Sequence, residues 1–346
     1  MSDAYADVDG AVELVDLDDI RDAADRIGDL ALHTPLIPLP HPDDADRTLT
    51  CKAESLQPTG AFKMRGAYNA ILQDLDRART TGVVAQSSGN HGRAVAWVAR
   101  RLGLRAVIVM PDAAPASKVA AVREQGAEVE LVPAGRRDVR PHELVEQHGF
   151  AYVPPYDDPR IVAGQGTAGL ELATDFPDLE LLLVPVSGGG LISGVATAVK
   201  SLRPAVAVIG VEPELAADAQ QSLREDRRVE WSTDQTYRTI ADGLRTTSVG
   251  VLPFAHIRRY VDDIITVTEE QIRAAMRHLV LAGRLVVEPS GAVATAAWLH
   301  DLVGTSNTTA AIVSGGSVEP SLLAEVVTGK RVVGDGEPAR SGDSDD

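Results

Sequence analysis

Lys63 occupies a position that is unusual for a solvent-exposed lysine. It lies between Phe62 and Met64, with glycines at positions 60 and 66, and it is one of only five lysines in the chain. A lysine amine held in apolar surroundings loses proton affinity and becomes a nucleophile that can form a Schiff base with a carbonyl compound. Lys63 is therefore a candidate covalent anchor for such a compound.

A glycine-rich loop later in the chain has the properties of a phosphate site. Residues 187–190, Ser-Gly-Gly-Gly, follow an apolar run at 181–186 and precede a predicted helix at 191–200. Consecutive N–H groups at a helix N-terminus can converge on one anion, and the helix dipole favours a dianionic phosphate there. A dinucleotide site is less favoured because the spaced G-x-G-x-x-G pattern is absent, and a simple tight turn is the other alternative.

Ser314 stands at the end of an apolar run at 310–313 and is followed by two glycines. Open α/β sheets bind ligands at the carboxyl ends of their parallel strands, which is where this run would place Ser314. Its hydroxyl could hydrogen-bond the nitrogen of a pyridine ring but could not compensate the charge of a pyridinium. The ring of such a cofactor would therefore stay largely neutral, which favours the loss of a β-substituent from the substrate. With Lys63 and the phosphate loop, Ser314 points to pyridoxal 5'-phosphate (PLP) as the cofactor.

A third loop has the properties of a carboxylate site. Ser87, Ser88, Gly89, Asn90 and His91 link a predicted strand to a predicted helix. Backbone N–H groups and two hydroxyls at a helix N-terminus suit a bound carboxylate. The alternative is a capping turn that binds no ligand.

Two carboxylates beyond the phosphate loop form a candidate metal site. Glu212 and Asp218 follow a predicted strand, and the carbonyl of Ala216 lies between them in sequence. Hard cations such as Mg²⁺ and Ca²⁺ prefer several oxygen ligands, which these residues could supply together with waters. In so acidic a chain, a solvated helix start is the alternative.

The order of apolar and amphipathic segments predicts an α/β fold. Apolar runs of strand length alternate with segments of helix length, the pattern of βαβ units and parallel sheets. Helices are expected after Asn90, near Ala116 and at 191–200. The predicted strands are 82–86, 105–110, 128–132, 181–186, 206–211, 264–267 and 310–313.

A proline-rich segment at 154–159 divides the predicted strands into two groups, because consecutive prolines interrupt both helices and central strands. We expect residues 1–75 and 157–333 to form a large cofactor-binding domain, with the cofactor between it and a small mobile domain at 80–152. Residues 334–346, rich in Gly, Asp and Ser, are expected to be a disordered acidic tail.

Composition restricts the partners and the location of the protein. With 50 acidic and 33 basic residues, the formal net charge is −17, which disfavours nucleic acid and anionic membranes. Few lysines and many carboxylates fit a protein kept in solution at high salt, so we hypothesise a halophilic source.

The single cysteine, Cys51, excludes an intrachain disulfide and is expected to be buried at a strand end. The N-terminus lacks the features of a signal peptide, and no apolar run approaches the roughly 18 residues of a membrane span, so we expect a cytoplasmic protein.

Taken together, several segments resemble those of the threonine dehydratase and serine racemase family in both order and spacing. These enzymes are PLP enzymes of fold type II, with the tryptophan synthase β-like fold. The resemblance extends from about His33 to about Gly329. The segments that carry it are the Lys63 loop, 88–91 (Ser-Gly-Asn-His), 164–167 (Gly-Gln-Gly-Thr), 188–190, 239–243 (Thr-Ile-Ala-Asp-Gly) and 314–316 (Ser-Gly-Gly).

The resemblance implies a role for each candidate site residue. Lys63 holds the cofactor covalently and removes the substrate α-proton, and Ser88 faces it from the opposite side as the second proton-transfer residue of racemases. Phe62 flanks the cofactor, Asn90 bonds its phenolic oxygen and Ser314 faces its ring nitrogen. The N–H groups of Ser187, Gly188, Gly189, Gly190 and Leu191 hold the phosphate. The substrate carboxylate binds at residues 87–91, and Glu212, Ala216 and Asp218 match a Mg²⁺ or Ca²⁺ site.

The implied activity is elimination of water from L-threonine, and from L-serine, by a homodimer or homotetramer, with isoleucine biosynthesis as one setting. A serine or aspartate racemase and a hydroxyaspartate ammonia-lyase are alternatives on the same site. A non-catalytic ligand sensor is disfavoured because the lysine and the phosphate loop are intact. A nicotinamide-dependent oxidoreductase is disfavoured because its glycine fingerprint is missing.

Overall fold

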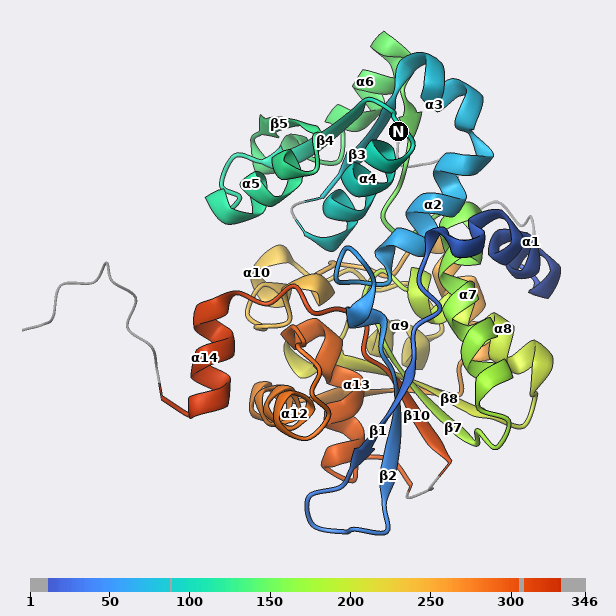
Figure 1. Ribbon diagram of the computed structural model, residues 1–346, viewed down its shortest axis with the longest axis vertical. Coiled ribbons are helices and arrows are strands. Elements are labelled where there is room, and N and C mark those ends of the chain that lie inside the picture. Colours follow the sequence, from blue (N-terminus) through green and yellow to red (C-terminus); the bar gives the residue numbers. More distant parts are fainter. Residues whose placement is uncertain (1–11, 88, 305–307, 331–346) are drawn as a thin grey trace, which may run out of the picture.

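The computed structural model describes residues 12–87, 89–304 and 308–330. Its framework consists of two β-sheets, each covered by helices, with the smaller sheet above the larger one in Figure 1. The predicted α/β architecture with parallel sheets is confirmed. Ser88 and the predicted tail at 334–346 lie outside the described residues.

The larger sheet has six strands in the order β1-β2-β10-β7-β8-β9. They are β1 (Leu36–Pro40), β2 (Thr48–Lys52), β7 (Leu181–Pro185), β8 (Ala207–Pro213), β9 (Asp263–Val267) and β10 (Thr309–Ile312). Neighbouring strands pair in parallel, except that β1 is antiparallel to β2. The loops that follow β7, β8 and β10 therefore leave the sheet at the same edge.

The smaller sheet has four parallel strands in the order β5-β4-β3-β6. They are β3 (Val83–Gln86), β4 (Ala106–Pro111), β5 (Glu128–Val132) and β6 (Ala151–Tyr152). All four lie between the two groups of strands of the larger sheet in sequence, so the chain leaves the larger sheet after β2 and returns to it at β7.

Helices cover both sheets. Those before and within the smaller sheet are α1 (Leu17–Ile27), α2 (Lys63–Gln73), α3 (Leu75–Thr81), α4 (Asn90–Arg101), α5 (Ala116–Glu124) and α6 (Arg140–His148). Those that follow are α7 (Pro159–Asp175), α8 (Gly190–Leu202), α9 (Asp218–Glu225), α10 (Thr233–Thr236), α11 (Val251–Tyr260), α12 (Glu269–Leu281), α13 (Pro289–Leu299) and α14 (Pro320–Thr328).

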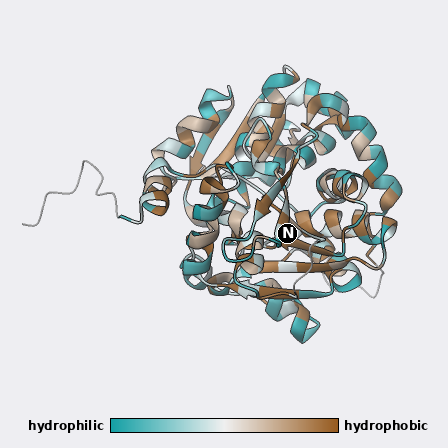
Figure 2. Ribbon diagram, turned by 60° about the horizontal axis from the view of Figure 1, so that its bottom comes forward, coloured by the Kyte–Doolittle hydropathy of each residue, from teal (hydrophilic) through white to brown (hydrophobic). Residues whose placement is uncertain are grey.

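The alternation of side chains along the strands builds two cores on the larger sheet. Leu182 and Val184 of β7 pack on one face with residues of α7 and α8, whereas Leu183 packs on the other face with residues of α12 and α13. A strand with both faces covered must be apolar throughout, which explains the uninterrupted apolar run at this position. Figure 2 shows the resulting pattern, with hydrophobic strands inside and hydrophilic positions on the outer helices.

Glycines let three helices approach one another closely. A Cβ on Gly164 of α7 would lie 2.7 Å from the Cα of Gly66 in α2, and a Cβ on Gly194 of α8 would lie 2.1 Å from the Val162 carbonyl of α7. The predicted motif at 164–167 is therefore part of a helix contact, in which α7 supports α2 and thereby the position of Lys63.

The predicted strands agree with the structure to within two residues, but three strands were not predicted. β1 contains two prolines and lies at the edge of its sheet, β2 is its antiparallel partner, and β6 has only two residues. The helices after Asn90 and at 191–200 begin earlier than predicted, at Asn90 and Gly190. Cys51 is buried in β2 as predicted. None of the described helices is both long and apolar enough to cross a membrane.

Candidate active site

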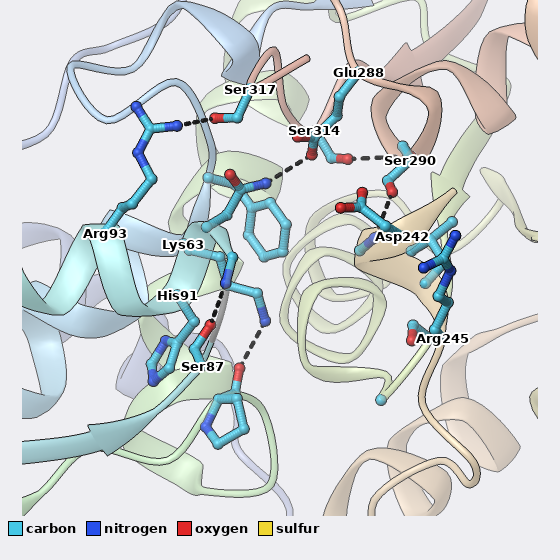
Figure 3. Close-up of a pocket in the computed structure, with 18 of the residues that line it drawn as sticks. Lys63, Ser87, His91, Arg93, Asp242, Arg245, Glu288, Ser290, Ser314 and Ser317 are labelled. Atoms are coloured by element: carbon cyan, nitrogen blue, oxygen red, sulfur yellow. Dashed lines mark hydrogen bonds between the residues drawn. The ribbon is translucent and has the colours of Figure 1, made fainter. Parts of the chain in front are cut away.

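A cavity of about 560 Å³ lies between the two sheets. It is lined from the smaller sheet by residues that follow β3 and from the larger sheet by residues that follow β7 and β10. Lys63, Ser87, His91 and Ser314 all line this cavity (Figure 3). The cavity therefore brings together four of the segments in which the sequence predicts chemistry.

Lys63 is the first residue of α2, and its amine is not paired with a carboxylate in the described structure. Lys52, Lys118 and Lys200 each form an ion pair, whereas Lys63 Nζ donates a hydrogen bond of 2.7 Å to the carbonyl oxygen of Pro155. Burial lowers the pKa of Lys63 from 10.5 to about 8. Roughly a tenth of the amine is therefore neutral and nucleophilic at pH 7, far more than for a lysine with the ordinary pKa.

The aromatic ring of Phe62 lies beside this amine. Lys63 Nζ is 5.1 Å from the centroid of the Phe62 ring. The backbone N–H of Phe62 donates to the carbonyl oxygen of Ser314, and Ala61 forms an isolated bridge with Gly315. These contacts fix the lysine loop against the end of β10, so that Lys63 and Ser314 reach the cavity from adjoining segments.

The glycine loop presents free N–H groups to the cavity. Within the described structure, the backbone hydrogen bonds include none donated by residues 187–191, and α8 has no side-chain cap because its N-cap residue is Gly189. Gly189 adopts a φ of 89°, which favours glycine, and a Cβ on Gly188 would lie 2.5 Å from the ring of Tyr156. A row of unused donors at the N-terminus of α8 fits a phosphate group.

Ser314 is buried at the end of β10, where its hydroxyl lies 3.5 Å from the carbonyl oxygen of Ser290. It lines the same cavity as Lys63 and the glycine loop. A hydroxyl that can both donate and accept suits a ring nitrogen in either protonation state.

The loop at 87–91 enters α4 from the smaller sheet. In the described residues the N–H groups of Asn90 and His91 have no backbone acceptor, which leaves them available to a carboxylate. The His91 Nε2 atom lies 2.9 Å from the Val153 carbonyl oxygen, and burial together with the charge of Lys63 lowers the pKa of His91 to about 3. His91 is therefore neutral, and its contribution to anion binding comes from its backbone N–H.

The structure adds several lining residues that the sequence analysis missed. Besides Lys63, four cationic side chains line the cavity: Arg93, Lys118, Arg137 and Arg245. Glu288 is a buried carboxyl in the lining, and its Oε1 atom accepts a hydrogen bond of 2.7 Å from Asn90 Nδ2. One signal for Glu288 was present in the sequence, because it is the only charged residue between 285 and 299.

The candidate metal residues lie outside the lining of this cavity. Glu212 ends β8 together with Pro213, and Asp218 begins α9. Both carboxyls are buried, and burial raises the pKa of each, with Asp218 adding to the effect on Glu212. The backbone N–H groups of Ala219 and Gln220 donate to Glu212, whereas neither carboxylate oxygen of Asp218 has a hydrogen-bond partner among the described residues. The described residues contain no cluster of three or more His, Cys, Asp or Glu side chains suited to a metal, so any cation here would also need carbonyl or water ligands.

Comparisons with known proteins agree with this geometry. A family model described as pyridoxal-phosphate dependent enzyme matches residues 27–315. An L-threo-3-hydroxyaspartate ammonia-lyase from Saccharomyces cerevisiae is 41% identical over 90% of this chain and 96% of that protein. An L-threonine ammonia-lyase from Thermotoga maritima is 41% identical over 80% of this chain and 69% of that protein.

A solved structure of maize serine racemase superimposes with a TM-score of 0.84 at 36% sequence identity, covering 92% of this chain and 98% of that one. The residues around the cavity fit PLP, because an unpaired amine, unused N–H donors at a helix N-terminus and a buried hydroxyl are the groups that its aldehyde, phosphate and ring nitrogen require. The chain therefore belongs to the family of pyridoxal-phosphate-dependent enzymes of fold type II that contains the threonine dehydratases and serine racemases.

Proposed function

We propose that the protein is an ammonia-lyase that eliminates water from L-threonine, and also from L-serine, to give 2-oxobutanoate or pyruvate and ammonia. The observation that carries this proposal is the unpaired Lys63 amine, which shares one cavity with the free N–H groups of residues 187–191 and with Ser314. The L-threonine ammonia-lyase relative supports the choice of substrate.

The site residues take the roles that their contacts allow. Residues 187–191 hold the phosphate, Phe62 packs beside the ring and Ser314 bonds the ring nitrogen. Asn90 bonds the phenolic oxygen with the N–H that it does not donate to Glu288. The substrate carboxylate binds the free N–H groups of Asn90 and His91, with Ser87, Ser88 and Gly89 completing that loop.

When bound, PLP supplies an electrophilic carbonyl and an electron-withdrawing ring that acidifies the α-proton of an amino acid. Lys63 is the group that accepts this proton, because its lowered pKa leaves the amine partly neutral. The β-hydroxyl leaves as water after protonation, and water then hydrolyses the unsaturated amino acid to a 2-oxo acid and ammonia. His91 is neutral and Ser314 carries a hydroxyl, so neither is a cation that would draw the substrate carboxylate away from its N–H donors.

The decisive experiment is turnover of the purified protein at high salt on L-threonine, L-serine and D-serine, with 2-oxo acid and enantiomer quantified together. Rapid formation of 2-oxobutanoate from L-threonine without enantiomer exchange is the expected result. Dominant exchange with little 2-oxo acid would show a racemase instead.

A hydroxyaspartate ammonia-lyase is a second candidate, favoured by two cations of the lining. Arg93 donates to the hydroxyl of Ser317 and Arg245 to the carbonyl of Thr239, so in the described contacts each has a neutral partner. A substrate with a second carboxylate could pair with either one. The S. cerevisiae relative, named for that substrate, supports this candidate. Arg245→Gln should then reduce kcat/KM for L-threo-3-hydroxyaspartate by at least about tenfold, the effect of losing one charge-assisted contact, while sparing L-threonine.

We propose that Glu212, Asp218 and the Ala216 carbonyl bind Mg²⁺ or Ca²⁺. Burial raises the pKa of both carboxyls, and Asp218, whose carboxylate oxygens have no hydrogen-bond partner in the described structure, further raises that of Glu212; a bound cation would stabilise the ionised forms of both. The melting temperature should rise on adding Mg²⁺ or Ca²⁺, and Asp218→Asn should remove the rise.

We further propose residues 80–152 as the small mobile domain and 1–75 with 157–333 as the large domain. Four side-chain contacts join the two at one rim of the cavity, from Asn90, Arg93, Ser117 and Lys118 to the larger-sheet side. A homodimer or homotetramer, a cytoplasmic location, a halophilic source and a part in isoleucine biosynthesis remain predictions from the sequence.

A further inference from the structure

Glu288 is buried beside two residues assigned to the cofactor, yet no ion pair of the described residues includes it. It is 5% exposed and lies at the start of α13. By contrast, Asp242, another carboxylate of the lining, pairs with Lys118 at 2.5 Å. Burying a carboxyl without a cation is costly, so the position of Glu288 needs an explanation.

The chain makes room for this carboxyl at Gly315. A Cβ on Gly315 would lie 2.4 Å from Glu288 Oε1, and the backbone N–H of Glu288 donates a hydrogen bond of 3.1 Å to the Gly315 carbonyl oxygen. The glycine that follows Ser314 therefore admits Glu288 to the edge of the cofactor cavity.

The contact between Glu288 and Asn90 determines which end of the Asn90 amide faces the carboxyl. An ionised carboxylate can only accept, so it holds the Nδ2 atom at 2.7 Å and leaves the second N–H of Asn90 free to donate. A protonated carboxyl can instead donate to Oδ1, which favours the opposite amide orientation. The two protonation states of Glu288 thus offer different Asn90 groups to the cavity.

We propose that Glu288 is a positioning residue whose ionised form orients the Asn90 amide to donate to the phenolic oxygen of PLP, and whose protonation reverses that amide. The inference rests on the proposed role of Asn90. Glu288 would then be a second titrating group of the site, besides Lys63, and it would act on the protein groups around the cofactor ring.

The charges around Glu288 support a titration near neutral pH. Burial and the nearby Asp242 raise the pKa of Glu288 to about 7, against the lowering effects of the Asn90 hydrogen bond, Lys118 and the backbone of Ser317. The remaining charged group at this rim, Arg93 of α4, donates to the Ser317 hydroxyl. Glu288 should therefore change its charge within the range in which the enzyme can be assayed.

The test measures the absorption spectrum and the PLP affinity of the holoenzyme between pH 5.5 and pH 8.5, chosen to span about one and a half units on either side of the expected transition. In the wild type, we expect affinity to fall by about tenfold as pH decreases through the transition, the effect of one lost hydrogen bond to a charged group. Glu288→Gln keeps an acceptor for Asn90 but cannot ionise, so this component of the pH dependence should disappear while affinity at pH 8 is retained. Glu124→Gln, an exposed substitution on α5, is the matched control and should behave as the wild type.

A double-mutant cycle with Asn90→Ala separates positioning from a general structural role. In the Asn90→Ala background, Glu288→Gln should leave the pH dependence unchanged, because the amide that Glu288 orients is gone. An unchanged pH profile in Glu288→Gln alone, or equal effects of that substitution with and without Asn90, would overturn the inference. Spectrum and affinity do not require turnover, so they remain readable even if L-threonine proves not to be a substrate.

Discussion

Lys63 and Arg65 lie two positions apart on α2, and their charges meet opposite surroundings. Lys63 faces the cavity and donates to a carbonyl oxygen. Arg65 faces the protein interior, where Glu54 lies 2.8 Å and Glu171 2.6 Å from its guanidinium. Burial alone would lower the pKa of both residues, but the two carboxylates raise that of Arg65, while that of Lys63 falls to about 8.

The contrast between Lys63 and Arg65 shows how one helix can hold both a candidate reactive residue and a residue that stabilises the fold. Arg65 also donates to Thr167 of α7 and to the Leu32 carbonyl, and Lys52 completes the cluster by pairing with Glu171. Two cations and two carboxylates form a neutral buried network that joins α2, α7 and the N-terminal strands. The paired charge of Arg65 holds the helix in place, whereas the Lys63 amine, which has no carboxylate partner, remains available to react.

The largest expected effect comes from removing the unpaired amine. Lys63→Ala should reduce kcat for 2-oxo acid formation by at least about 10²–10⁴-fold, the contribution of a positioned proton acceptor, and the absorption of the covalently held cofactor should disappear. Lys200→Ala, which alters an ion pair on α8, is the control and should retain activity. Wild-type turnover in Lys63→Ala would refute the proposed mechanism.

Breaking the paired charge should affect stability more than chemistry. Arg65→Met leaves Glu54 and part of Glu171 buried without their cation, and we expect the free energy of unfolding to fall by about 3–5 kcal/mol. Denaturant titration measures this loss. Arg77→Met, at an exposed arginine of α3, should change it by less than about 0.5 kcal/mol. Similar losses in both variants would mean that the network is not the source of stability.

Replacing Lys63 is expected to increase the free energy of unfolding, the opposite of the effect at Arg65. Its pKa is lower in the folded protein than the unfolded value of 10.5, so the buried ammonium costs stability below about pH 8, and this cost disappears as pH rises toward 10.5. Lys63→Met in the cofactor-free protein should therefore raise the free energy of unfolding at pH 7 by about 0.5–2 kcal/mol, with a smaller gain at pH 10. A variant less stable than the wild type at pH 7 would contradict the lowered pKa.

The smallest expected effect concerns the loss of stability at acidic pH that arises from Glu54. Burial tends to raise the pKa of Glu54, but Arg65, Thr34 and Lys52 lower it below 4.5, so its contribution is present above pH 4.5 and is lost as pH falls through the folded value. In Arg65→Met this acid-dependent component should shrink, which unfolding curves at pH 3.5 and 6, about one unit or more on either side of the ordinary glutamate pKa, would reveal. An unchanged acid dependence would show that Arg65 does not control the Glu54 pKa.

Much of the fold and of the site could be predicted because the signals are local. The predicted strands at 181–186 and 310–313 are continuous apolar runs, and the glycine loop and Ser314 follow them directly, so their position at the carboxyl ends of parallel strands required no tertiary information. The proline-containing β1 and the two-residue β6 gave no such signal, because neighbouring strands stabilise them.

The sequence alone was enough to predict the cofactor and the family and to nominate Lys63 as the candidate anchor, since these depend on short local motifs and on their order along the chain. Only the tertiary structure decided which charges have partners. Glu288 lies 198 positions from Asn90, and Glu171 lies 106 positions from Arg65, so no local pattern relates them. The reactivity of a buried charge depends on the groups within a few ångströms of it, and those distances exist only after the chain has folded.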